Sequence, residues 1–369
     1  MSGSRDVIAG FLELDQNLFG TENKLPGLKK LEVQLAVRTE HYSDFGGTTN
    51  PKLAVIWKPT NSLAVRASVG TSFRPPSLRE LFGAVTLFPL PVVDIRRNNE
   101  TVIVPVDFGG NPDLKPEKSQ NWNAGVVWDA PLVRGLSLTI NYWSLRQKER
   151  IASLDTQDLL AAEALFPDRV VRATPTAADI AAGLPGRLIS LDLTSLNATQ
   201  VRLRGADFEV GYHAKNRLGE FDLRFAGARI FSATQQLTAA SPVEELAGTL
   251  AGSTVGDEAD HPAVKFKGKL SLFWSRGAWS AGVTERYTGR SRDPLRPLHP
   301  IIADHAETDL QVDYAPPVRS GILAGTRLSL SVVNLFNSRP PFRDFFFGFP
   351  TALYDPRGAV YEMRLTKGF

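Results

Sequence analysis

The side chains able to do chemistry are sparse and form none of the common catalytic arrangements. The chain of 369 residues contains no cysteine, so it has no disulfide, thiolate metal site or cysteine nucleophile. It also lacks a Gly-x-Ser-x-Gly elbow, a phosphate-binding loop and a His-Glu-x-x-His pair. His299, Asp304 and His305 share one predicted loop and could touch a metal, but a loop histidine is more often solvated. The sequence therefore predicts no enzyme, metal site or cofactor.

An aromatic-rich segment at 342–350 is the strongest candidate for binding. It lies in a predicted long loop beside the final strand. Exposed aromatic clusters usually bind a ligand or are covered by neighbouring loops. Packing between loops, or at an upper lipid interface, is the alternative interpretation. The substrate-contact candidates are Phe342, Phe345, Phe346, Phe347, Phe349 and Tyr354.

The elements that must position these residues are β-strands. Between residues 31 and 38, leucine and valine occupy the odd positions, and mainly polar residues occupy the even ones. This period of two is typical of a strand with one apolar face, and it recurs in about thirteen segments. A short helix is also predicted in the excursion at 150–197, where Asp155 is suited to cap a helix through 159–162.

Short and long connections alternate along the chain. Short turns lie near 59–61, 129–131, 214–216 and 276–278, whereas long loops run near 70–121, 150–197 and 232–262. Outer-membrane barrels have this asymmetry, whereas soluble sandwiches mix their connections. Aromatic residues at strand ends fit interfacial girdles. They are Trp57, Trp128, Tyr142, Tyr212, Trp274 and Tyr314. The pattern therefore favours an all-β protein, an antiparallel transmembrane β-barrel of outer-membrane type.

The polar face of these strands would line the lumen of such a barrel. Its charges could pair between strands as a solvated wall, which is the more common role for any single residue. The lumen-lining candidates are Arg38, Arg66, Asp207, Glu209, Arg224, Lys265 and Lys267.

The composition excludes other classes of protein. No window approaches twenty continuous apolar residues, so a helical membrane span is not predicted. The net charge is +3 with both signs evenly mixed, which gives no basic block for nucleic acid. Residues 1–4 lack the apolar region of a signal peptide, so an exported protein would need a signal outside this sequence.

Two proline-containing motifs flank the first long loop. They read Ser-Phe-Arg-Pro-Pro-Ser-Leu at 72–78 and Asn-Pro-Asp-Leu-Lys-Pro-Glu at 111–117. Further motifs are Asp-Phe-Gly at 44–46, Arg-Gly-Ala-Asp at 204–207, Val-Asn-Leu-Phe-Asn at 333–337 and Tyr-Asp-Pro-Arg-Gly at 354–358. Taken together, these motifs resemble those of the TonB-dependent outer-membrane receptors, and the similarity covers nearly all of the chain. The family usually has alanine where this chain has Pro75.

The resemblance implies a place and a role. Such receptors move scarce substrates, often ferric siderophores, cobalamin or saccharides, across the outer membrane of Gram-negative bacteria. The TonB complex acts on a plug domain and its TonB box inside a barrel of about twenty-two strands. Residues 1–369 have no room for the plug, the TonB box or about nine N-terminal strands, so we expect a partial barrel. The implied partners are outer-membrane lipid, the barrel assembly machinery, a small-molecule or metal-chelate substrate and, only through the missing plug, TonB.

The expected strand number also predicts an open sheet. With about thirteen antiparallel strands, the first (5–17) and the last (359–369) run in the same direction, so antiparallel closure between them is unavailable. Both would then be edges, which invite association. The terminal Phe369 resembles the assembly signal of outer-membrane barrels.

Two other classes of protein remain as alternatives. One is a surface adhesin or a soluble carbohydrate-binding β-sandwich that uses the aromatic loop. The other is an esterase-type barrel enzyme, for which no Ser/His spacing stands out.

Overall fold

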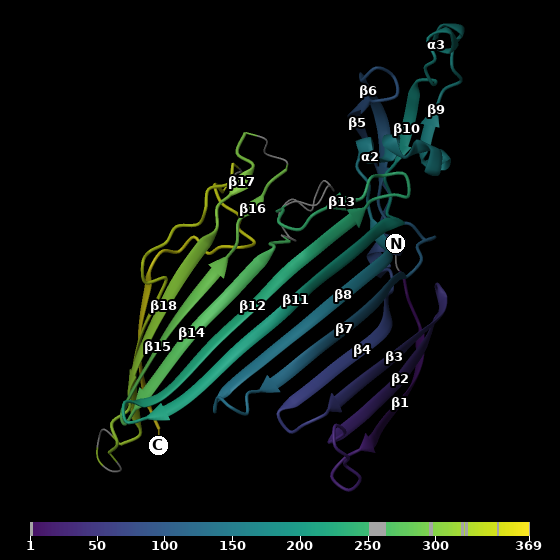
Figure 1. Ribbon diagram of the computed structural model, residues 1–369. Helices are drawn as coiled ribbons and strands as arrows, with labels where there is room; N and C mark the ends of the chain where they lie inside the picture. Colours follow the sequence, from purple (N-terminus) through teal and green to yellow (C-terminus); the bar gives the residue numbers. More distant parts are fainter. Residues whose placement is uncertain are drawn as a thin grey trace.

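One continuous antiparallel sheet dominates the computed structural model, which describes residues 3–250, 263–294, 298–318, 321, 324–344 and 347–368. Among the described residues, thirteen strands form the main path of this sheet, each paired with the next, and the short β13 (Glu244–Glu245) pairs with β12 off that path (Figure 1). We call this sheet the wall. Its strands are β1 (Val7–Phe19), β2 (Lys30–Tyr42), β3 (Gly46–Lys58), β4 (Leu63–Arg74), β7 (Glu117–Asp129), β8 (Leu136–Ala152), β11 (Leu196–Asn216), β12 (Gly219–Gln236), β14 (Phe266–Arg276), β15 (Trp279–Thr288), β18 (His305–Tyr314), β19 (Thr326–Val333) and β20 (Val360–Lys367).

The wall is open. Among the described residues, β1 pairs only with β2, and β20 pairs only with β19. Thirteen antiparallel strands leave the first and the last running in the same direction, as the sequence predicted. The prediction of a partial, open barrel sheet is therefore confirmed.

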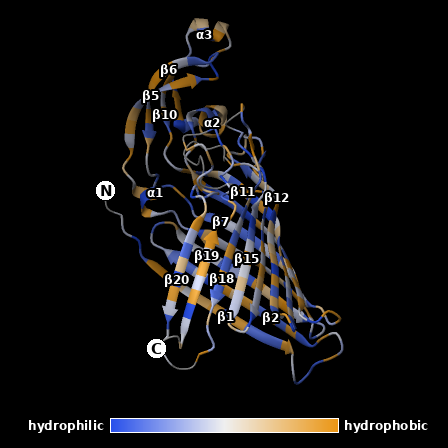
Figure 2. Cartoon of the chain, turned by 90° about the vertical axis from the view of Figure 1, so that its left-hand side faces the viewer, coloured by the Kyte–Doolittle hydropathy of each residue, from blue (hydrophilic) through white to orange (hydrophobic). Residues whose placement is uncertain are grey.

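The two faces of the wall differ in polarity, as the alternation predicted. In β2 and β3 the register sets Leu31 opposite Trp57 and Leu35 opposite Leu53 on one face. Leu35 is 48% exposed and Leu53 is 39% exposed, because no protein layer covers them. Apolar and polar residues alternate along the strands in Figure 2. A soluble sandwich needs a second sheet over the apolar face, and the described residues contain none, so that alternative is wrong.

The described helices are short, and none is long and apolar enough to span a membrane.

Two of the long loops fold together into a separate small structure, which we call the loop unit. It stands beyond one end of the wall in Figure 1. Its strands form a sheet in the order β5-β6-β10-β9, in which β6 and β10 are parallel. Its elements are β5 (Thr86–Asp94), β6 (Glu100–Phe108), α2 (Thr156–Ala161), η1 (Glu163–Leu165), η2 (Pro167–Arg169), β9 (Val170–Arg172), α3 (Ala177–Ala181) and β10 (Leu188–Asp192).

The loop unit corrects one prediction and confirms another. Residues 70–121 were predicted to form a long loop, yet they contain the β5–β6 hairpin. Pro89 and Pro91 lie in the edge strand β5, where a missing N–H is tolerated. Pro105 lies outside the short β6–β10 pairing. In the second loop, Asp155 caps α2 as predicted, accepting a hydrogen bond from the Asp158 N–H at 2.7 Å.

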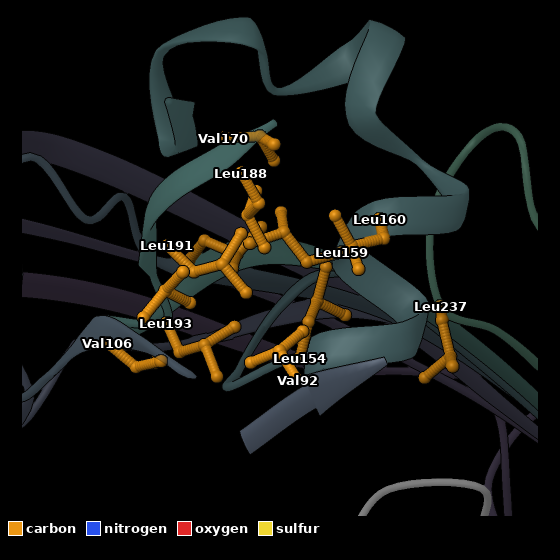
Figure 3. Close-up of a cluster of buried hydrophobic side chains, with 12 residues drawn as sticks. Val92, Val106, Leu154, Leu159, Leu160, Val170, Leu188, Leu191, Leu193 and Leu237 are labelled. Carbon is orange, nitrogen blue, oxygen red and sulfur yellow. The ribbon is translucent and has the colours of Figure 1, made fainter. Parts of the chain in front are cut away.

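The main buried apolar cluster of the described chain lies in the loop unit and not in the wall. Twelve buried side chains pack together there, ten from the two loops and the others Leu196 of β11 and Leu237, which follows β12 (Figure 3). Leu159 and Leu160 of α2 are fully buried, and Val106 and Leu191 meet where β6 pairs with β10. The wall has no comparable core because its apolar face is uncovered.

The two proline-containing motifs meet at the base of the loop unit. The guanidinium of Arg74 donates to Glu80 at 3.0 Å and to Glu117 at 2.6 Å. Glu117 is only 2% exposed and also accepts from the Ile151 N–H at 2.9 Å. In the helix α1 (Leu78–Phe82), Glu80 completes a capping box with Ser77. These motif residues therefore fix where the long loops leave the wall.

Candidate functional site

The loop between β19 and β20 holds the aromatic candidates and is fixed to the wall at its first residue. Asn334 is buried with a φ of 55°, and its N–H donates to Asp309 at 3.0 Å. Its side chain donates to the Ser338 carbonyl at 2.8 Å and accepts from the Ser338 N–H at 2.7 Å. Asp309 also accepts from Arg286 at 3.2 Å. The Val-Asn-Leu-Phe-Asn motif thus joins this loop to the polar face of the wall.

A buried ion pair joins this loop to its neighbour. The Nε of Arg343 donates to Asp293, in the loop between β15 and β18, at 2.7 Å. The two side chains are 2% and 0% exposed. The Arg343 N–H also donates to the carbonyl of Gly348 at 2.9 Å, and Gly348 has a φ of 75° that favours glycine. The backbone on both sides of the central aromatic residues is therefore held in place.

Two of the predicted contact residues lie open to solvent on this loop. Phe342 is 61% exposed and Phe347 is 60% exposed. The ring of His299 meets the ring of Phe342 edge to face, with 5.8 Å between centroids. Phe349 is half-buried. Phe345 and Phe346 lie outside the described residues, as does Phe369.

Tyr354 occupies a different environment from the other candidates. It is 7% exposed and packs edge to face on His305, with centroids 5.1 Å apart. Burial raises the pKa of the Tyr354 hydroxyl to about 12, and the nearby carboxylates of Asp304 and Glu307 add to the effect. His305, expected to be solvated, instead contacts Glu307 at 3.1 Å and has a side chain only 9% exposed. In this conformation Tyr354 supports the base of the loop.

The lumen-lining candidates are spread over the polar face, and several have partners. Arg66 of β4 donates to the side-chain oxygen of Asn141 of β8 at 3.0 and 2.7 Å. The two side chains meet over Gly125 of the intervening strand β7, where any larger residue would collide with Asn141. Arg224 pairs with Asp222 at 2.7 Å on the same strand. Arg38 pairs with Glu40. This arrangement resembles the paired, solvated wall that was the plainer interpretation of these charges.

The remaining lumen candidates do not form one cluster. Asp207, Glu209 and Lys267 line a shallow depression on β11, β12 and β14. Lys265 precedes β14 and lies beside Gly248 in a loop, outside the strand to which the sequence pattern assigned it. Among the described residues, no group of three or more histidine, aspartate or glutamate side chains is placed to hold a metal ion.

Sequence reasoning missed the residues that organise this end of the wall. Arg286 donates to Glu307 at 2.8 Å, and both alternate onto the polar face of their strands, so the period of two could have identified them. Asp293 and Arg343 gave no such signal, because they lie in separate loops and only the fold brings them together.

The pKa values of two acidic residues in the loop unit are shifted in opposite directions, although both residues occupy the third position of a short helix. Burial raises the pKa of Asp158 in α2 to about 6, with Asp155 and Glu244 adding to the effect. One carboxylate oxygen of Asp158 is buried without a hydrogen-bond partner. In α3, hydrogen bonds from Thr176 and then Arg97 lower the pKa of Asp179 to about 2.

Replacing Asp158 by Asn is expected to stabilise the loop unit by about 1–2 kcal/mol at pH 7.5, after allowance for its partial exposure. Because the pKa of Asp158 is higher in the folded state, its favourable contribution is present below pH 4 and is lost as the pH rises through about 6. The same substitution should therefore have almost no effect at pH 4. Hydrogen exchange of the loop-unit amides at both pH values measures the difference.

Asp179→Asn is the matched control, because it should weaken the loop unit at pH 7.5. Two results would contradict this account: slower hydrogen exchange in both variants, or slower exchange in Asp158→Asn by the same factor at both pH values. Either would show that burial of the ionised Asp158 carboxylate does not destabilise the loop unit.

The comparisons with known proteins agree on one architecture. A family model described as TonB dependent receptor-like, beta-barrel, matches residues 2–335. The siderophore receptor PirA from Acinetobacter baumannii has a TM-score of 0.64 at 13% identity, and the match covers 98% of this chain and 45% of PirA. A mutant ferric enterobactin receptor, PfeA, from Pseudomonas aeruginosa in complex with enterobactin has a TM-score of 0.60 at 15% identity, with 97% and 45% covered.

The copper transporter OprC has a TM-score of 0.53 at 15% identity, and the match covers 98% of this chain and 47% of OprC. At these identities the likeness to solved structures shows the fold alone. The chain therefore spans about half the length of the solved proteins that it matches.

Proposed function

Because the chain belongs to the TonB-dependent receptor-like β-barrel family, we propose that residues 1–369 form part of the barrel of a receptor in the outer membrane of a Gram-negative bacterium. The proposed receptor takes up a small metal chelate, with a ferric siderophore as the favoured class. Its proposed partners are outer-membrane lipid, the barrel assembly machinery and, through a plug domain, the TonB complex. Transport of this kind consists of binding and gating and breaks no bond.

The observation that carries the proposal is the exposed aromatic surface on a fixed loop. Phe342 and Phe347 lie open to solvent, while the buried Arg343–Asp293 pair holds the backbone between them and the neighbouring loop. An apolar surface that is ordered before binding loses little conformational entropy when a ligand arrives. Aromatic rings also suit the flat, partly apolar surface of many metal chelates.

The neighbours in structure support the same class of substrate. PirA is a siderophore receptor, and the PfeA structure is a complex with enterobactin. OprC is a copper transporter. Metal species other than ferric siderophores are therefore the second class of substrate to test. The polar face of this chain supplies both signs of charge along the path from the loops, including Arg286, Glu307 and Lys267.

Replacing Phe345, Phe346, Phe347 and Phe349 by Ser in the full-length receptor is expected to weaken substrate binding at least about tenfold. The reason is that the ligand would lose its main apolar contact surface in this part of the chain. Equilibrium binding of ferric catecholate and hydroxamate siderophores, cyanocobalamin and Cu²⁺ to purified receptor would identify the class and measure the loss.

A matched control removes exposed apolar residues from the loop unit instead, through Leu87→Ser, Val93→Ser and Ile103→Ser. These three side chains are 58%, 38% and 75% exposed. We expect the control to bind normally and both variants to reach the cell surface. Unchanged affinity of the four-phenylalanine variant would remove this loop from the binding site.

A further inference from the structure

A group of cations lies on the apolar face of the wall near the loop end of its strands. The strand register sets Lys118 of β7 directly opposite Lys148 of β8. It also sets Arg146 of β8 directly opposite Arg202 of β11. Arg204 follows on the same face of β11, since it is two residues from Arg202. We call Lys118, Arg146, Lys148, Arg202 and Arg204 the outer basic strip.

Neighbouring aromatic rings establish which face carries the strip. Tyr142 lies two residues below the level of Arg204, on the same face, and is opposite Ala206. Its ring packs against Trp122 at 5.0 Å and against Phe231 at 6.0 Å between centroids. Trp122 and Phe231 are 43% and 50% exposed. These rings form an upper girdle, and the strip extends from the level of Trp122, where Arg204 lies, to about 13 Å beyond it along the strands. That places the strip at the depth of lipid headgroups.

Within the part of the chain that the structure describes, only one of the five charges of the strip has an ion-pair partner. Like charges directly opposite each other in a sheet repel. Among the described residues, Lys148, Arg202 and Arg204 form no ion pair. Lys118 has Glu149 at 3.3 Å, and Arg146 donates only to Gln200 at 3.0 Å while its Nε is buried without a partner. On the opposite face, by contrast, Arg286 lies between Glu307 and Asp309.

The surface of the strip is also hollowed. Two depressions meet there and share Gln120 and Arg146. Lys118 and Lys148 line the first, together with the hydroxyl of Thr71. Arg202 and Arg204 line the second, together with hydroxyl groups of Ser144 and Ser232. Guanidinium, ammonium and hydroxyl donors in a shallow hollow are a suitable set for phosphate oxygens.

We propose that the outer basic strip binds the phosphate groups of a phosphorylated glycolipid in the outer leaflet of the membrane. The phosphates lie between the opposed cations and relieve their repulsion. The acyl chains then run down the apolar face below the upper girdle, along Ala124, Val126 and Ile140. The inference rests on the membrane location in the proposed function, but it does not depend on which substrate is transported.

The test measures lipid retained by the full-length receptor in detergent, with bisphosphorylated lipid A as the probe and native mass spectrometry as the readout. The variant carries Arg146→Gln, Arg202→Gln and Arg204→Gln. We expect its occupancy by bisphosphorylated lipid A to fall about tenfold or more, because three charge-assisted contacts are lost. Dephosphorylated lipid A should bind weakly to both proteins.

The matched control neutralises three cations of the polar face, through Arg224→Gln, Lys267→Gln and Lys269→Gln. Retention in the control should stay within about twofold of the parent, since this face does not meet lipid. Equal losses in the two variants, or no loss in either, would overturn the proposal. So would displacement of the lipid by inorganic phosphate at the same concentration, which would show a site for the free anion.

Two further measurements keep folding and transport separate from lipid binding. The variant Arg146→Lys, Arg202→Lys and Arg204→Lys keeps the charges and should retain lipid within about threefold of the parent. If the glutamine variant does not insert, Arg204→Gln alone is measured, with an expected loss of about threefold; an unchanged occupancy would overturn the proposal. Substrate binding is assayed in parallel on the same variants. If the proposed substrate does not bind, the lipid measurement still tests the outer basic strip independently.

Discussion

Replacing Arg343 by Met is expected to destabilise the paired loops at the end of the wall by about 3–5 kcal/mol. The substitution leaves the carboxylate of Asp293 fully buried without the guanidinium that contacts it at 2.7 Å. Losing the cationic partner of a buried carboxylate costs more than losing an exposed ion pair, because water cannot take the place of the guanidinium. Native-state proteolysis of the loops in the full-length receptor measures the free energy of their opening.

Two controls separate charge from packing. The double variant Asp293→Leu with Arg343→Met replaces the pair with apolar side chains, and should recover most or all of the lost stability. Arg357→Met removes the ion-pair partner of Asp355 at an exposed site, where the Arg357 side chain is 74% exposed and the Asp355 side chain is 48% exposed. This substitution should not measurably change the stability of the loops. If Arg343→Met and Arg357→Met behave alike, the buried pair does not hold the two loops together.

Leu330→Arg is expected to cost about 2–4 kcal/mol of folding stability in a bilayer, if residue 330 lies near the midplane. Leu330 is 47% exposed on the apolar face, opposite Val312 and Met363 of the adjacent strands. A guanidinium at that position would have to enter hydrocarbon. Titration of refolding into lipid vesicles with urea measures the cost.

Ser329→Arg is the matched change on the other face of the same strand. The hydroxyl of Ser329 donates to Asp313, so a new cation there meets water and a carboxylate. We expect this penalty to be much smaller than that of Leu330→Arg. Equal penalties for the two variants would contradict the assignment of the apolar face to lipid.

The wall could be predicted from the sequence because its information is local. An alternation of apolar and polar residues can be recognised within a single strand. The faces predicted for the residues of β2 and β3 therefore agree with the structure at each position. The strand number then implied the open sheet. In the loop unit the deciding contacts join segments far apart in sequence, such as Val106 with Leu191. Pro89 and Pro91 are compatible with a strand only because β5 lies at the sheet edge, and Pro105 of β6 because it lies outside the pairing with β10.

The candidate site was predictable only in part for the same reason. The density of aromatic residues identified the loop and the exposed Phe342 and Phe347. It could not separate them from Tyr354, whose burial depends on His305 from another segment. The residues that fix the loop, Asp293 and Arg343, are single charges in polar stretches and become recognisable only when their burial is known.

The shared core of the loop unit makes two distant loops a single cooperative unit. Neither loop can bury its apolar residues alone, because Leu159 and Leu160 come from one loop and Val92 and Val104 from the other. Amide protons of β6 and β10 should therefore report one common free energy of opening, that of the whole unit. During synthesis and membrane insertion the first loop must wait for the second, so its apolar hairpin stays unprotected until β10 is in place.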